Sequence, residues 1–221
     1  MYALLAQYYD NVSAERFEAD MEAKDWVIRL LDPAGGLIGF STLQLYDAPA
    51  PSEPATVIYS GDTITARSHR RTGALAGAFG HLLLRAIREH PGRPVYWLLT
   101  SKGVRTYRFL PVFFRAFHPA FDRDTPAHLK RRIDALAAAK FGSDYSPDRQ
   151  IVSHRGARDR LRASEHDPLL LKRNDPHVQF FLRRNPGYVD GDELVCLTPM
   201  SEDNLNAGAR RVIQHTEVYW R

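Results

Sequence analysis

The chain has 221 residues, of which 44% are hydrophobic and 25% are charged, a composition typical of a soluble globular protein with a full hydrophobic core. No apolar run approaches the roughly 20 residues needed to cross a bilayer, and the single cysteine, Cys196, excludes an internal disulfide, so we expect a cytoplasmic protein without a membrane span. The formal net charge of +4 favours an anionic partner, which leaves nucleic acid, a phosphorylated cofactor and an acidic acyl carrier protein open.

The N-terminal quarter predicts a helix followed by a hairpin. Ser13 is a helix-capping residue, and the apolar spacing after it predicts a helix as far as residue 23. Residues 25–32 and 37–47 have strand patterns and are separated by the turn sequence PAGG. Residues 48–55 are too rich in proline to join a sheet, so they predict a loop.

A strand, a helix and a second strand are predicted next. Residues 56–66 (TVIYSGDTITA) are rich in β-branched side chains, and Gly61 in their middle predicts a bulge or a close backbone approach. Apolar residues then follow helical spacing from Leu75 to Ile87. Residues 94–100 (PVYWLLT) predict a buried strand, so the two strands should pair in parallel across the helix.

An aromatic segment and another helix complete the first two thirds of the chain. Residues 101–110 (SKGVRTYRFL) predict a short helix that Pro111 ends or kinks. Residues 107–117 (YRFLPVFFRAF) form an aromatic stripe, and most such stripes belong to a core. Thr125 predicts the cap of the following helix, with Pro126 at its first position and Gly142 at its end.

The C-terminal third predicts a basic loop and then folded elements. Residues 142–172 are basic and poor in large apolar side chains, which predicts a linker, and they include an arginine run at positions 155, 158, 160 and 162. A helix opening at Asp175, a strand at 192–198 and a last helix capped by Ser201 follow. We therefore divide the chain into a core, 1–141, and a part that completes the core or packs on it, 142–221.

The junction between the strand 56–66 and its helix has the sequence Arg70-Arg71-Thr72-Gly73-Ala74-Leu75. The first amides of a helix lack partners and carry the positive end of its dipole, so a phosphate there gains several hydrogen bonds. Gly73 lets a ligand approach the backbone, and the two arginines add charge. By itself this pattern is also typical of a solvated helix start. It is neither a P-loop nor the dinucleotide-binding fingerprint.

In its context, the junction resembles the pyrophosphate-binding loop of the GNAT (N-acetyltransferase-like) superfamily. There, an Arg or Gln, two residues, a Gly, one residue and a Gly or Ala join a central strand to a helix; residues 70–73 fit, and Leu75 departs. The element order from about residue 13 to 117 is also similar. The resemblance implies an α/β fold: a mixed, mostly antiparallel sheet with a central parallel, splayed strand pair and flanking helices, plus a helical C-terminal extension. It also implies that residues 70–75 bind the pyrophosphate of coenzyme A (CoA).

The resemblance further implies an N-acyltransferase, which moves an acyl group from an acyl-CoA or acyl-carrier-protein thioester to an amine of a small molecule or peptide. The thioester would lie where the two parallel strands separate. Asp62 would act as the base, or else it caps the bulge or pairs with an arginine. Tyr107 would protonate the thiolate, or else it is a packed tyrosine with its hydroxyl at the surface. The aromatic segment 107–117 could line a tunnel for a medium or long acyl chain.

Two other classes of function remain open. A non-catalytic module of the same fold could sense an acyl thioester or an acidic partner and would need neither Asp62 nor Tyr107. A nucleic-acid-binding protein could use the arginine run, but no recognisable nucleic-acid module accompanies it. No metal is expected, because the histidines lack metal-ligand spacing and one cysteine cannot build a thiolate zinc site.

Overall fold

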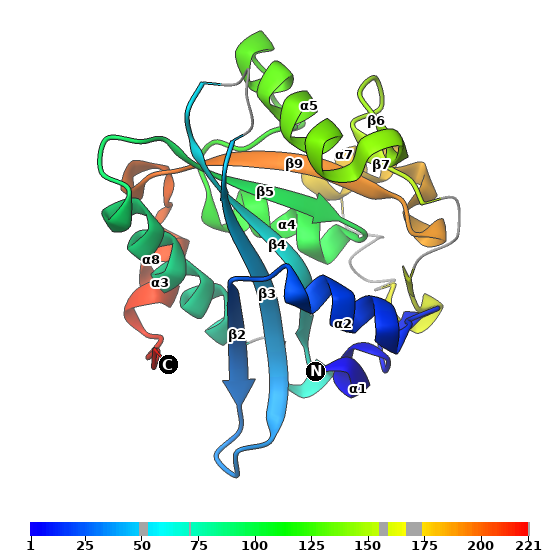
Figure 1. The fold of residues 1–221 in the computed structure, drawn as a ribbon, viewed down its shortest axis with the longest axis vertical. Coiled ribbons are helices and arrows are strands. Elements are labelled where there is room, and N and C mark those ends of the chain that lie inside the picture. The colour runs from blue at the N-terminus through cyan, green and yellow to red at the C-terminus, as the bar shows by residue number, and fades with distance from the viewer. Residues whose placement is uncertain (49–52, 71, 155–158, 167–173, 221) are drawn as a thin grey trace.

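The computed structural model describes residues 1–48, 53–70, 72–154, 159–166 and 174–220. Its centre is a seven-stranded sheet with the order β2-β3-β4-β5-β9-β7-β6 (Figure 1). The pair β4–β5 is parallel, and the other neighbours are antiparallel, which confirms the predicted fold class. The strands are β2 (Trp26–Leu31), β3 (Leu37–Asp47), β4 (Thr56–Thr65), β5 (Val95–Ser101), β6 (Tyr145–Ser146), β7 (Ile151–Val152) and β9 (Glu193–Met200).

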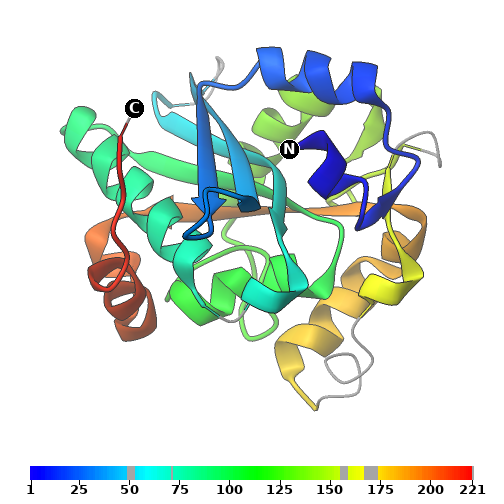
Figure 2. The same ribbon diagram turned by 90° about the horizontal axis from the view of Figure 1, so that it is seen from below.

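Helices cover both faces of this sheet. On one face, a large apolar core packs under α3 (Ala74–Glu89), α4 (Val104–Phe113), α7 (Pro176–Arg184) and α8 (Ala207–Gln214). The other face carries α1 (Tyr2–Leu5), α2 (Ala14–Glu22) and α5 (Ala127–Phe141). Figure 2 looks along the sheet, with α1 and α2 (blue) on one side and α4 and α7 (green and gold) on the other. None of the described helices is long and apolar enough to span a membrane.

The glycine in the middle of β4 interrupts its pairing with β3. The register shifts between Ser41 and Leu43, opposite Gly61, which confirms the predicted bulge. A Cβ on Gly61 would lie 2.7 Å from Oγ1 of Thr42 and 3.0 Å from Cε of Lys24, so a larger residue would force one of them aside. The bulge therefore changes the course of β4 at the residue before Asp62.

At the same point the two parallel strands separate. Their pairing runs from Thr56 opposite Val95 to Ser60 opposite Leu99. Beyond it, β4 continues along β3 as far as Thr65, while β5 continues along β9 as far as Ser101. The predicted splayed pair is thus present, and its opening begins at Gly61.

The C-terminal third contributes strands to the same sheet. β9 pairs with β5 over the whole of β5, from Val95 to Ser101. The expectation of a linker at 142–172 was wrong where β6 and β7 form, because Ile151 and Val152 are fully buried beside β9. Strands of two residues are too short to show a periodicity in the sequence. The expected cap at Thr125 was also wrong, since Pro126 occupies the cap position of α5.

A second strand pairing, outside the main sheet, joins the N-terminal segment to residues 160–161. β1 (Tyr9–Asp10) runs antiparallel to β8 (Arg160–Leu161), and the amide of Arg162 continues this contact by donating to the Tyr8 carbonyl at 3.0 Å. Arg162 also donates to the Ala6 carbonyl. The N-terminal segment and residues 160–162 therefore form one ribbon next to the separated strands.

Candidate functional site

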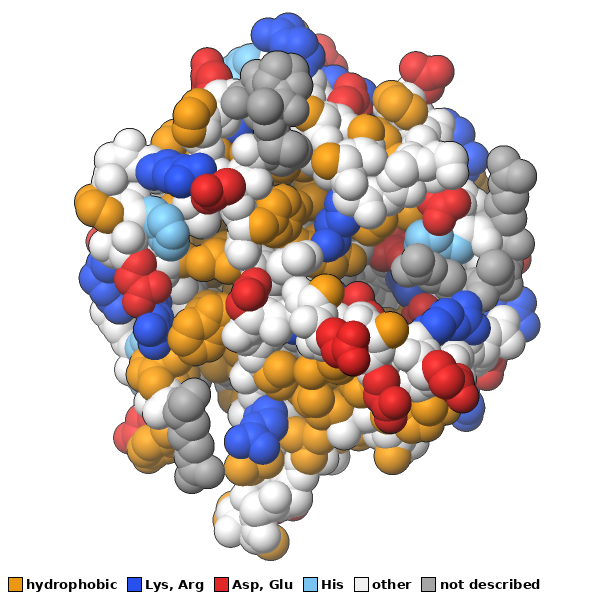
Figure 3. Space-filling view, in the orientation of Figure 1, with side chains coloured by type: hydrophobic (Ala, Val, Ile, Leu, Met, Phe, Trp, Pro, Cys, Tyr) orange, Lys and Arg blue, Asp and Glu red, His pale blue; other side chains and the backbone are white. Residues whose placement is uncertain are grey.

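A cavity of about 410 Å³ opens where β4 and β5 separate. Its walls come from the N-terminal segment, α2, the ends of β4 and β5, the start of α4, and the side chains of Asp159 and Glu193. The cavity is bordered by four carboxylates and two cationic side chains. The carboxylates are Asp20, Asp62, Asp159 and Glu193, and the cations are Arg16 and Lys102. Figure 3 shows further acidic side chains gathered over α2, which forms one side of the cavity. The site is thus acidic in a protein of positive net charge.

Asp62 lies in this cavity, at the bulge of β4. It makes no hydrogen bond or ion pair with any other residue of the described ranges. Burial raises the pKa of its carboxyl group to about 6, although Lys102 acts in the opposite direction. A carboxylate with a pKa near neutrality can accept a proton at physiological pH. Neither the bulge-capping nor the arginine-pairing alternative is seen among the described residues.

Lys102, directly after β5, lies between two carboxylates, those of Asp159 and Glu193. Its Nζ lies 2.6 Å from Oδ2 of Asp159 and 3.6 Å from Oε1 of Glu193. Burial alone would lower the pKa of Lys102, but the two carboxylates raise it above its ordinary value. Burial alone would raise the pKa of Glu193. Lys102 and, to a smaller extent, His154 act in the opposite direction, so the pKa of Glu193 lies at about 2. Lys102 and Glu193 therefore stay charged at neutral pH, whereas Asp62, with a pKa of about 6, is suited to exchange a proton.

Sequence analysis missed most of this cavity. Tyr9, Lys102, Asp159 and Glu193 come from four segments spread over the chain, and no local spacing links them. Tyr9 carries a hydroxyl whose pKa is raised mainly by burial. The one local pattern that points to the cavity is a bulge glycine next to an acidic residue. This pattern identifies Asp62 but none of the other residues that border the cavity.

The predicted phosphate-binding loop does join β4 to α3. Gly73 precedes the first helical residue with φ +74°, the left-handed region that favours glycine. The Thr72 hydroxyl accepts from the Ala74 amide at 3.3 Å, and Leu75 is buried. The Gly77 amide makes the first bond of the helix, to the Gly73 carbonyl. Arg71 lies outside the described residues. A phosphate role for residues 70–75 stays a prediction.

Arg70 is held by neighbours within the protein. Its Nε donates to the Thr65 carbonyl at 3.0 Å, and its Nη2 donates to Oε2 of Glu165 at 2.6 Å. The guanidinium also lies over the Tyr8 ring, 4.9 Å from its centroid. Arg67 binds the same Glu165 carboxylate. Sequence analysis missed both Arg67 and Glu165, because the carboxylate arrives from 95 positions further along the chain.

Tyr107 lies in the core and is not among the residues that border the cavity. Its side chain is fully buried, and its hydroxyl donates to the Pro119 carbonyl at 3.0 Å. Rings of Phe117, Phe180 and Phe181 surround it. The geometry therefore gives the predicted proton-donor role no support and matches the packed-tyrosine alternative, except that the hydroxyl is inside the protein.

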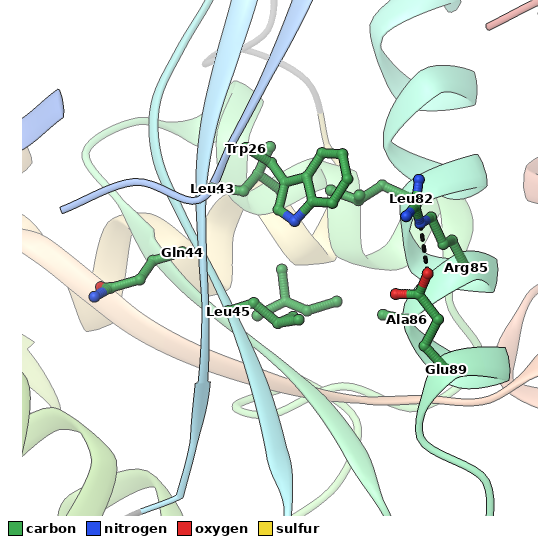
Figure 4. A pocket seen from close by; sticks show the side chains of 9 residues that line it. Trp26, Leu43, Gln44, Leu45, Leu82, Arg85, Ala86 and Glu89 are labelled. Atoms are coloured by element: carbon green, nitrogen blue, oxygen red, sulfur yellow. Dashed lines mark hydrogen bonds and ion pairs between the residues drawn. The ribbon is translucent and has the colours of Figure 1, made fainter. Parts of the chain in front are cut away.

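The aromatic segment leaves little empty space around it. Phe109, Phe113 and Phe114 border a cavity of about 10 Å³ between α3, α4 and α8, about the room that one water needs. A second cavity of about 10 Å³ lies between Trp26 and α3, where Arg85 and Glu89 form an ion pair (Figure 4). Neither has room for an acyl chain. The described residues also contain no cluster of three or more metal-ligating side chains.

Comparison with known proteins gives partial likenesses to solved structures. No protein-family model matches the chain, and no curated protein matches it significantly. The GNAT-family N-acetyltransferase YhbS of Escherichia coli, solved with CoA, is similar over 49% of this chain and 59% of its own, with 14% identity and a TM-score of 0.39. An acetyltransferase of Trypanosoma brucei is similar over 52% of this chain and 82% of its own, with 21% identity and a TM-score of 0.34.

A third similar structure is NAA60 of Arabidopsis thaliana, solved with a bisubstrate analogue. The likeness covers 49% of this chain and 86% of that one, with 12% identity and a TM-score of 0.28. The chain thus spans about three fifths of YhbS and most of the other two. YhbS and the Trypanosoma brucei protein are acetyltransferases.

Proposed function

We propose that this protein is an N-acyltransferase that moves an acyl group from a CoA or carrier-protein thioester to an amine. The observation that carries the proposal is the Asp62 carboxylate, which has no ion-pair partner among the described residues and lies in a 410 Å³ cavity where two parallel strands separate. Strand separation exposes backbone groups of β4 and β5 that no longer bond to each other, and a thioester could bind these groups.

The proposed reaction uses Asp62 as the base. An acceptor amine enters the cavity as an ammonium ion, which the excess of carboxylates there attracts. Asp62 takes one proton from the ammonium ion, and the amine nitrogen attacks the thioester carbonyl carbon. The carbon–sulfur bond then breaks, and the thiolate leaves and takes up the second proton, which the nitrogen gives up as the amide forms. Lys102 and Tyr9 border the same cavity and carry the N–H and O–H groups suited to stabilise the departing anion by hydrogen bonds.

The donor would approach through the β4–α3 loop. Its phosphates would bind the first amides of α3 and the neighbouring arginines, as expected for residues 70–75. For the acyl group we propose a short chain, because the cavity of about 10 Å³ beside the aromatic segment has no room for a longer one.

The test is thiol release from a series of acyl-CoA thioesters, from acetyl to decanoyl, with a panel of small amines and N-terminal peptides. The same acyl groups on an acyl carrier protein distinguish the two donors. Asp47→Asn is a matched control, since Asp47 lies on the exposed end of β3 and pairs with Arg93. The proposal would be rejected if no combination of thioester and amine gave turnover and if calorimetry detected no CoA binding.

A further inference from the structure

The carboxylate of Glu165 occupies a site made by two arginines. Arg67 donates to Oε1 through Nε at 2.8 Å and also through Nη2, while Arg70 donates to Oε2 at 2.6 Å. Both carboxylate oxygens are therefore bound, and the Glu165 side chain is only 2% exposed. In this arrangement the chain supplies an anion of its own to a binding site that precedes helix α3.

The two arginines differ in a way that suits an external ligand. Arg70 is fixed by the Thr65 carbonyl and the Tyr8 ring, so its guanidinium keeps its position when the carboxylate leaves. The Arg67 side chain is 60% exposed and can therefore meet an anion from solvent. Both lie within six residues of Gly73, and the first amides of α3 follow it, of which that of Ala74 donates to the Thr72 hydroxyl. Guanidinium groups next to a helix N-terminus are a common phosphate-binding set.

Glu165 belongs to a single short turn, so a movement of this turn would disrupt no α-helix or strand. Ala163–Glu165 is a single 3-10 turn, and Ala163 and Ser164 are exposed. The segment is anchored before the turn by the β1–β8 pairing and the bond from the Arg162 amide to Tyr8, and after the turn by the His166 ring, which lies 5.2 Å from the Tyr188 ring. Breaking a buried ion pair is costly when a charge is left unpaired, but exchanging one anion for another leaves both arginines paired.

We propose that Arg67 and Arg70 form a phosphate site for the thioester donor, and that Glu165 occupies this site until the donor displaces it. The nature of the ligand rests on the proposed function, whereas the anion site itself does not. Arg67 thereby becomes a donor-binding residue outside the 70–75 loop. Glu165 becomes an internal competitor, which reduces the apparent donor affinity by the fraction of molecules in which the site is free.

The test is calorimetric titration of CoA into the full-length protein and its variants. Glu165→Gln keeps the size of the side chain and removes its charge, so it should tighten CoA binding by about fivefold or more. Arg67→Gln should weaken CoA binding to a similar degree. Pantetheine, which carries no phosphate, should bind the wild type and Glu165→Gln equally. Glu89→Gln is the matched control, since it breaks an arginine–glutamate pair on α3 away from the site and should leave CoA binding unchanged (Figure 4).

The opposite results are equally definite. CoA binding to Glu165→Gln that is unchanged or weaker would overturn the competitor role, and unchanged binding to Arg67→Gln would overturn the phosphate site. If Glu165→Gln does not fold, Arg67→Gln decides, because that side chain is largely exposed. Inorganic pyrophosphate separates the two proposals. Suppose that pyrophosphate binds the wild type, binds Glu165→Gln more tightly, and that CoA binds neither protein. The anion site would then stand and the acyltransferase proposal would be rejected. Binding of neither ligand would overturn both.

Discussion

At the scale of single residues, Asp62, the proposed base, gives the sharpest prediction. Asp62→Asn should lower the rate of acyl transfer about 10²–10⁴-fold, because the base is lost. The acidic limb of the pH–rate profile, with an apparent pKa of about 6, should disappear with it. Steady-state kinetics across pH 5–9 measure both effects. Full activity in a folded Asp62→Asn protein would remove Asp62 from the mechanism.

The same substitution should affect stability in the opposite direction. The pKa of Asp62 is raised from 3.8 in the unfolded chain to about 6 in the folded protein, so the folded state binds more protons between these values. The free energy of unfolding therefore falls as the pH rises from about 4 to 6, and the loss persists above pH 6. Asp62→Asn should melt at a higher temperature than the wild type at pH 7, and the difference should vanish near pH 4.

Tyr107 allows a test that separates packing from catalysis. Tyr107→Phe removes the hydrogen bond to the Pro119 carbonyl, which should lower the free energy of unfolding by about 0.5–1.5 kcal/mol. Because the hydroxyl is buried away from the cavity, kcat of the folded variant should stay within a factor of two or so of the wild type. Thermal melts and kinetics on the same samples decide. A large fall in kcat with an unchanged melting temperature would restore the proton-donor role.

At the scale of elements, α3 and α8 are in contact through glycine. A Cβ on Gly77 would lie 2.5 Å from Cβ of Thr216 and 2.9 Å from the Val212 carbonyl oxygen. Gly77→Ala should therefore lower the free energy of unfolding by about 1–3 kcal/mol through overpacking. Helix propensity alone would predict a gain of about 1 kcal/mol. Urea unfolding measures the sign, and a stabilised variant would show that α8 packs less closely than the structure has it.

Elements with a clear local pattern could be predicted from the sequence, and short ones could not. Ser13 accepts from the Arg16 amide as the cap of α2, and β2, β3, β4 and β5 lie within two residues of their predicted bounds. β6, β7 and β8 have two residues each and are stabilised by neighbours far along the chain. The cavity could not be predicted for the same reason. Only Asp62 has a local pattern that identifies it, whereas Lys102, Asp159 and Glu193 come together through tertiary structure.

At the scale of the whole molecule, the C-terminal third supplies the neighbour of β5. Without β9, that central strand would expose an unpaired edge and the fully buried side chains Leu194 to Leu197 would be absent from both cores. Residues 1–141 expressed alone should therefore fail to unfold cooperatively on heating. Co-expression with residues 142–221 should restore a cooperative transition. A cooperative melt of 1–141 alone would show instead that the division at residue 141 separates an independent domain.

The contact of Trp220 with Trp26 and Arg85 gives the protein an optical label at its C-terminal end. The two indole rings meet edge to face at 5.7 Å, with the Arg85 guanidinium over both. The third tryptophan, Trp97, is buried against Phe79 in the centre of the sheet. Iodide or acrylamide can reach the half-exposed Trp220 but not Trp97, so the quenchable part of the emission reports the attachment of the C-terminal segment to the edge strand β2, and the shielded part reports the core.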